Sequence, residues 1–225
     1  MQVFYESRRE LAPTIWEYSF RPERRVDFVP GQYVNLGLEA VTNDQRGKSR
    51  TLTIVSLPDE PSLRFIVKHP ENQSIYKQRL ADLLPGTAAS ITDAMGDVIL
   101  PKLTSIPLVF VAGGIGFASF ISILQYLEKT GETRKITLLY GRRNKYELLY
   151  PELVKRFPFT ARQLYITPQR LTPQDILSAA HDDAVVFISG GEKFVEDLTS
   201  QLRIAGLGSE RMVFDFFDGY TEDQI

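Results

Sequence analysis

The stretch VFVAGGIGFASFISIL, residues 109–124, decides how the chain is expected to fold. It continues an apolar, β-branched run that begins at Leu108, which is typical of a strand buried on both faces. After three glycines, apolar residues recur at helical spacing until Thr130 and Gly131, which signal a helix end. A strand, a glycine turn and a helix place backbone N–H groups where an anion can bind. An ordinary strand-to-helix turn looks the same, so this stretch alone leaves both interpretations open.

The chain after about residue 105 alternates between strand-like and helical segments. This alternation predicts a doubly wound parallel sheet. Ligands bind such sheets at the carboxyl ends of the strands, so the strand ends GGIG, YGRRN and SGG are expected along one edge. Strands are expected at 107–113, 135–141, 163–167, 184–191 and 211–217, and helices at 117–130, 150–157, 172–180 and 192–206.

Residues 1 to about 100 have the pattern of an antiparallel β domain. Short alternating or apolar runs, separated by Pro, Gly and Asp turn signals, occur at 14–20, 33–38, 50–56, 62–69 and 88–92. One helical segment, residues 74–86, interrupts them, with Ile75, Leu80, Leu83 and Leu84 as its apolar stripe. Many short strands with a single helix indicate a small antiparallel barrel. The expected fold class is therefore two-domain β plus α/β, with an antiparallel β-barrel over residues 1–102 and a doubly wound parallel α/β domain over residues 103–225.

The composition of the 225-residue chain excludes several classes of function. Its 43% hydrophobic and 24% charged residues are typical of a soluble globular protein without a membrane span. The absence of cysteine excludes disulfides, a cysteine nucleophile and a cysteine-ligated iron–sulfur cluster, and His69 and His181 lie too far apart in sequence to favour a metal site. Redox chemistry would then require a bound organic cofactor. The net charge of −2 gives no attraction to nucleic acid, and the charged N-terminus lacks the apolar core of a signal peptide, which favours a cytoplasmic location.

Seven segments, in the same order along nearly the whole chain, resemble motifs of the ferredoxin–NADP reductase superfamily of flavin-dependent reductases. The resemblance implies a β-barrel that binds FAD and an α/β domain that binds NADPH or NADH. The segments are FVPGQYVNL (28–36), RTLTIVS (50–56), VKHPENQSIYKQRLADLLPG (67–86), AGGIGFASF (112–120), LLYGRRN (138–144), FISGGEKFVEDL (187–198) and FFDGY (216–220), the last typical of one bacterial branch.

In the first half, the resemblance assigns residues to the flavin. Arg50 would contact the flavin pyrophosphate through charge-assisted hydrogen bonds, and Thr53 would place its hydroxyl near flavin N5, which receives the hydride. Leu52 stands where the family usually has an aromatic that stacks on the isoalloxazine, and Tyr220 (or Phe217) would supply an aromatic on the nicotinamide-facing side. A surface cation at Arg50 and an ordinary strand residue at Thr53 are the structural alternatives. The flavin set is completed by Thr51, by the backbone of Val67, Lys68 and His69, and by Ser74 and Lys77, whose expected contact with a diphosphate favours FAD over FMN.

In the second half, the resemblance assigns residues to the nicotinamide dinucleotide. Gly113, Gly114 and Gly116 would let the backbone approach its pyrophosphate, and Ser189 stands where many relatives have a cysteine beside the nicotinamide. Thr53, Ser189 and Tyr220 form the expected catalytic set. The sequence departs from the family pattern at Ser119 and Gly191, each in place of a proline. The nucleotide set also includes Ile115, Gly190, Arg142, Arg143 and Arg170.

The loop cations favour NADPH over NADH. Arg142 and Arg170 follow two of the expected strands, and neither loop starts with an Asp or Glu that would suit the ribose hydroxyls of NADH. Solvated loop cations would give the same pattern.

The function predicted first is an NAD(P)H-dependent flavoprotein reductase that passes electrons to a protein or small-molecule acceptor. A non-catalytic module that keeps flavin or nucleotide binding is an alternative, and the departures at Leu52, Ser119 and Gly191 favour it. An electron-transfer subunit of a larger complex is a third possibility. No motif identifies the acceptor or the oligomeric state.

Overall fold

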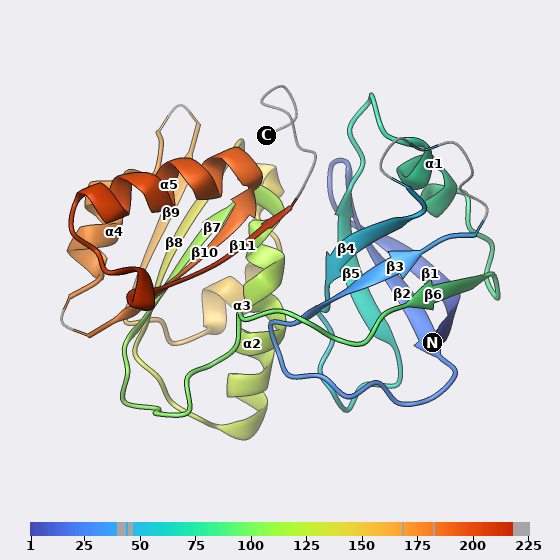
Figure 1. The fold of residues 1–225 in the computed structure, drawn as a ribbon, viewed down its shortest axis with the longest axis horizontal. Helices are drawn as coiled ribbons and strands as arrows, with labels where there is room; N and C mark the ends of the chain where they lie inside the picture. The colour runs from blue at the N-terminus through green and yellow to red at the C-terminus, as the bar shows by residue number, and fades with distance from the viewer. Residues whose placement is uncertain (40–43, 45–46, 168, 182, 218–225) are drawn as a thin grey trace.

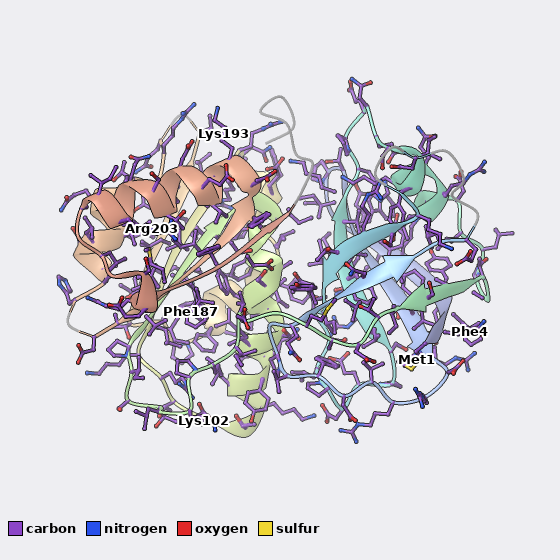
Figure 2. All side chains as sticks on the ribbon, viewed as in Figure 1. Met1, Phe4, Lys102, Phe187, Lys193 and Arg203 are labelled. Carbon is purple, nitrogen blue, oxygen red and sulfur yellow. The ribbon has the colours of Figure 1, made fainter. Side chains whose placement is uncertain are left out.

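The structure is a computed structural model that describes residues 1–39, 44, 47–167, 169–181 and 183–217. It holds two sheets, one of six antiparallel strands and one of five parallel strands with helices, which lie next to each other (Figure 1). The chain enters through the antiparallel half, where Met1 and Phe4 lie at the end remote from the parallel half (Figure 2). The expected two-domain β plus α/β fold is confirmed.

The antiparallel sheet has the order β4-β3-β6-β1-β2-β5. Its two edge strands approach each other, because Ile54 forms a bridge with Phe65 and the Val55 N–H donates to the Arg64 carbonyl at 2.9 Å. The sheet therefore curves into a barrel, as the sequence predicts. Its elements are β1 (Gln2–Ala12), β2 (Ile15–Pro22), β3 (Tyr33–Gly37), β4 (Ser49–Thr53), β5 (Leu63–Lys68), α1 (Ile75–Ala81) and β6 (Ala88–Ile91).

Two features of this half differ from the sequence prediction. The first strand, β1, was not expected, because its apolar alternation at Val3 and Tyr5 gives way to a run of exposed charged residues. Helix α1 is shorter than the expected 74–86 and buries Tyr76 and Leu80, which are four residues apart and face the barrel core. Leu84, expected in its apolar stripe, is 73% exposed.

The parallel sheet has the order β11-β10-β7-β8-β9, with helices on both faces. Helices α2 and α3 pack on one face and α4 and α5 on the other, so the sheet is doubly wound as predicted (Figure 1). Figure 2 labels Phe187, whose ring on β10 lies 5.6 Å from that of Phe110 on β7 in the core on the α2 side. The elements are β7 (Leu108–Gly113), α2 (Ala118–Thr130), β8 (Ile136–Arg142), α3 (Pro151–Arg156), β9 (Ala161–Ile166), α4 (Pro173–Ala179), β10 (Val185–Gly191), α5 (Glu192–Ile204) and β11 (Met212–Phe217).

The helix ends follow signals that the sequence carries. Helix α2 ends at Gly131, whose φ of 69° is the left-handed conformation that glycine adopts without strain. Helix α4 starts at Thr172, whose hydroxyl and the Asp175 carboxylate form a reciprocal capping box. These caps fix where each helix starts and ends relative to its strands.

A buried polar network joins the two halves. Glu17 of the barrel is 4% exposed and lies between Arg9, at 2.6 Å, and Arg64, at 3.2 Å. The Tyr150 hydroxyl, just before α3, contacts Glu17 and accepts a hydrogen bond from Arg64 at 2.7 Å. On another part of the junction, the Gly31 N–H donates to the Ser122 hydroxyl of α2 at 3.0 Å. These contacts fix how the barrel face meets the parallel sheet.

No helix in the described ranges of the chain is long and apolar enough to cross a membrane.

Candidate functional site

The carboxyl edge of the parallel sheet brings the expected strand ends together. Gly113 on β7 pairs with Gly141 on β8, and Ser189 on β10 pairs with Ala112 of β7 on one side and Asp215 of β11 on the other. The three glycine-bearing segments therefore lie along one edge, as predicted. A short 3₁₀ turn, Gly114–Phe117, joins β7 to α2 at this edge and was not expected.

The glycines at this edge serve different purposes. A Cβ on Gly116 would lie 2.1 Å from the Ser189 carbonyl oxygen, so glycine is needed there for the 3₁₀ turn to pack against β10. A Cβ on Gly113 or Gly190 would lie within 2.8 Å of the Phe194 ring, which covers both residues. Gly114 has a φ of +54° and no atom within 4 Å of its Cβ position. Of these four glycines, Gly114 leaves the open space that a ligand backbone contact requires.

Two buried serines and an aspartate form a cluster at the same edge. The Ser119 and Ser189 hydroxyl oxygens lie 3.0 Å apart, and both side chains are fully buried. Ser119 also donates to the Asp215 carboxylate at 3.2 Å. Because Ser119 has one proton, which it gives to Asp215, Ser189 is the donor in the serine pair. The hydroxyl at Ser119, where the resembling family has proline, therefore connects Ser189 to Asp215.

A pocket of about 250 Å³ lies between the barrel and the last strand of the parallel sheet. One wall comes from the outer face of β3 and β4 and the other from β11, whose carboxyl end points toward the barrel in Figure 1. Asp215 and two partly exposed phenylalanines stand in the β11 wall. The pocket is lined by Gly31, Tyr33, Thr51, Gly96, Asp97, Val98, Phe214, Asp215 and Phe216.

The residues of β4 divide between this pocket and the barrel core. Thr51 lines the pocket and donates to the Asn35 side chain at 2.8 Å. Thr53 pairs with the pocket residue Tyr33, and its buried hydroxyl has no hydrogen-bond partner among the residues that the structure describes. An unpaired buried hydroxyl costs free energy, which a ligand acceptor or donor could recover. Leu52 is 8% exposed and packs in the barrel core.

Arg50 lies in a second cluster, next to α1. Its guanidinium forms an ion pair with Asp44 at 2.6 Å, donates to the Ser74 hydroxyl at 3.4 Å, and lies 4.7 Å from the centre of the Tyr76 ring. The Asp44 carboxylate also accepts from the Tyr76 N–H at 2.9 Å. This donor set already holds an anionic group, so its chemistry fits the phosphates of a dinucleotide. The surface-cation alternative for Arg50 is wrong, because its side chain is 8% exposed.

The remaining residues assigned to the flavin have local partners. Ser74 caps α1 by accepting from the Lys77 N–H, and Val67 is buried in the barrel core. The Lys68 ammonium lies 3.5 Å from Glu147 of the parallel half. His69 contacts the Tyr18 hydroxyl at 2.8 Å and the Gln73 side chain at 2.6 Å, and burial lowers its pKa. These contacts fix both ring nitrogens of the histidine.

The cations expected to bind the nucleotide follow β8 and β9. Arg142 donates to the Lys145 carbonyl at 3.1 Å, and its buried Nε has no hydrogen-bond partner in the described part of the chain. Arg143 and Arg170 are exposed. Ile115, within the 3₁₀ turn, is partly buried and packs against the core on the α2 side of the sheet. Tyr220 lies outside the described residues.

Sequence reasoning missed two acidic residues of these clusters, Asp44 and Asp215. Asp215 interrupts the apolar strand RMVFDFF (211–217), and an acid inside an otherwise apolar strand is a signal that could have indicated it. Asp44 lies in a charged segment, DQRGKSR (44–50), where no pattern separates it from ordinary loop charges.

Comparison with known proteins shows that the chain is similar to reductase components of oxygenase systems. Residues 110–199 match the family model of the oxidoreductase NAD-binding domain. The chain is 32% identical to the reductase component of phenol 2-monooxygenase from Pseudomonas sp. strain CF600 over 158 residues, which cover 66% of this chain and 42% of that one. It is 24% identical to the ferredoxin–NAD(P)⁺ reductase component of naphthalene 1,2-dioxygenase from Pseudomonas putida, over 88% of this chain and 62% of that one. The chain thus spans about half the length of these relatives.

Solved structures show the same fold at lower sequence identity. The ferredoxin–NADP⁺ reductase of Plasmodium falciparum matches with a TM-score of 0.79 and 16% identity, over 96% of this chain and 95% of that one. The ferredoxin–NADP⁺ reductase of Neisseria gonorrhoeae, solved with bound FAD and NADP, matches with a TM-score of 0.76 and 17% identity, over 96% of this chain and 98% of that one.

Proposed function

We propose that the chain is a flavoprotein reductase of the ferredoxin–NADP reductase superfamily, which moves a hydride from NAD(P)H to FAD and passes the electrons to a protein or small-molecule acceptor. Its match to the oxidoreductase NAD-binding domain, its similarity to reductase components and its fold support this proposal. The observation that carries this proposal is the pocket between the two halves. It lies between the barrel face of Tyr33, which pairs with Thr53, and β11, whose Asp215 pairs with Ser189 of β10. We assign residues 1–102 to the FAD domain and residues 103–225 to the nucleotide domain.

The barrel residues would bind the cofactor at its two ends. Arg50 and Ser74 supply the donors for the FAD diphosphate, and the pocket beside Thr51 and Thr53 takes the isoalloxazine. Bound FAD would supply a hydride acceptor at its N5 and could release the two electrons one at a time. The Thr53 hydroxyl, which has no hydrogen-bond partner among the described residues, would then pair with that end of the ring.

The parallel half would orient the nicotinamide. Gly114 offers open backbone for the dinucleotide pyrophosphate, and Ser189, held by Ser119, would lie beside the nicotinamide ring. Positioning of donor and acceptor atoms about 3–3.5 Å apart supplies much of the catalysis, because hydride transfer needs no proton transfer by a side chain. Exposed Arg170 and partly buried Arg142 favour NADPH, since each can meet the extra phosphate.

The experiment that tests the proposed function is a steady-state assay of the flavin-loaded protein with ferricyanide, a one-electron acceptor. Each NAD(P)H oxidised should reduce two ferricyanide ions, and protein stripped of flavin should be inactive until FAD is added. A full complement of bound FAD with no NAD(P)H oxidation would contradict the proposal.

A further inference from the structure

The ion pair between Asp44 and Arg50 lies in the interior of the protein. The Asp44 side chain is 3% exposed and the Arg50 side chain 8%, and the Oδ1 of Asp44 lies 2.6 Å from the Nη2 of Arg50. Burial of two charges costs desolvation energy that only a well-formed pair with further hydrogen bonds recovers. The pair has such bonds, because Arg50 also donates to the Gly47 and Ser49 carbonyls at 2.9 and 2.7 Å.

Asp44 occupies the Arg50 donor that the proposed function gives to the FAD diphosphate, together with a backbone N–H of α1. The Asp44 Oδ1 accepts from the Arg50 Nη2, the same nitrogen that donates to the Ser74 hydroxyl. The Asp44 Oδ2 accepts from the Tyr76 N–H at 2.9 Å. A phosphate oxygen on Arg50 and Tyr76 would need the same two donors. The carboxylate and a diphosphate therefore compete for one position.

We propose that Asp44 is an internal competitor of the cofactor, whose carboxylate holds Arg50 and the start of α1 in the absence of a diphosphate and is displaced when FAD binds. This inference rests on the proposed function, because it takes the diphosphate of FAD as the competing ligand. Protein in which Asp44 pairs with Arg50 cannot accept the diphosphate. The apparent affinity for FAD is therefore reduced in proportion to the fraction of protein in which this pair is open. The same pair keeps the arginine from being buried without a counter-ion.

Two variants of the full chain, freed of flavin, test this competition. In Asp44→Ala the competing carboxylate is gone, and FAD should bind at least about tenfold more tightly than to the parent protein, since opening no longer costs free energy. Asp44→Asn keeps the shape and loses the charge, so it should give an intermediate gain. Riboflavin has no phosphate, and its affinity should change by less than about twofold in both variants. Asp59→Ala is the matched control, because it removes an acid that pairs with Lys129 on the exposed surface.

Inorganic pyrophosphate separates this inference from the proposed function. Asp44→Ala should unfold at a lower temperature than the parent protein without ligand, and pyrophosphate should raise its unfolding temperature by more than it raises that of the parent. Tighter pyrophosphate binding in a protein that binds no FAD would refute the proposed function and retain the competition. Equal or weaker binding of FAD and pyrophosphate by both Asp44 variants, with Asp59→Ala unchanged, would overturn the competition while leaving the flavin assignment of Arg50 intact.

Discussion

Gly116 provides the sharpest test of how the nucleotide edge is built. An ideal Cβ at this residue would lie 2.1 Å from the Ser189 carbonyl oxygen and 2.6 Å from the Gly190 nitrogen. Ordinary van der Waals contact starts at 3.4 Å, so Gly116→Ala requires the 3₁₀ turn and β10 to separate by more than 1 Å (3.4 minus 2.1 Å). The obstacle is backbone on both sides, which cannot rotate away as a side chain can.

Gly116→Ala should therefore lower the free energy of unfolding by about 3 kcal/mol or more, at the upper end of the cost of overpacking a core. Urea unfolding followed by tryptophan fluorescence and far-UV circular dichroism measures the difference. Gly114→Ala is the control in the same motif, because its Cβ meets no atom within 4 Å while its φ of +54° costs a non-glycine residue about 1–2 kcal/mol. A loss for Gly116→Ala no larger than that for Gly114→Ala would refute the close-packing argument.

Three further predictions concern the cofactor and the nucleotide. Arg50→Ala should weaken FAD binding roughly 10- to 100-fold, because one or two charge-assisted hydrogen bonds are lost, and unchanged flavin content after purification would contradict the assignment. Thr53→Val should retain flavin but slow its reduction by NAD(P)H roughly tenfold in stopped flow, as expected for one lost hydrogen bond. Thr51→Val is the control and should not slow reduction, because the Thr51 hydroxyl is already bonded to Asn35. Equal rates in the parent and both variants would make Thr53 an ordinary strand residue. Arg170→Ala should raise the KM for NADPH and leave the KM for NADH unchanged, and in the parent protein the KM for NADPH should depend on salt. The control is Arg203→Ala, which removes another exposed arginine, on α5. Parallel changes in both KM values would count against selection of the extra phosphate.

The sequence predicted the fold closely because the periodicity of most segments agrees with their burial. Residues 107–113 were predicted as a buried strand, and Leu108–Gly113 forms β7 with five buried residues followed by a half-buried glycine. The misses in the barrel half have physical reasons. In β1 the exposed charges hide a strand that pairs with β2 in a hairpin and with the distant β6. Helix α1 ends at Ala81, so Leu84 lies beyond it and is exposed, while Tyr76 and Leu80 form the packed face of the helix.

The sequence predicted those parts of the site whose position follows from the end of a strand. It did not predict contacts that depend on how the folded chain brings two side chains together. The glycine edge follows from the alternation of strands and helices. That Gly113 lies under the Phe194 ring, however, depends on how α5 packs on the sheet, which no local pattern reports. The same holds for Asp215, whose partner Ser119 is 96 positions away in sequence. Asp44 lies six positions before Arg50, but no residue pattern indicates that the two side chains pair.

The proposed reductase function is tested most directly by an anaerobic titration of the FAD-loaded protein with NADPH and, in parallel, with NADH. We expect the yellow colour of the flavin to be lost in proportion to added nucleotide, with one nucleotide consumed per flavin and NADPH effective at the lower concentration. Flavin that remains oxidised and yellow in excess of both nucleotides would contradict the account and identify a binding module without hydride transfer.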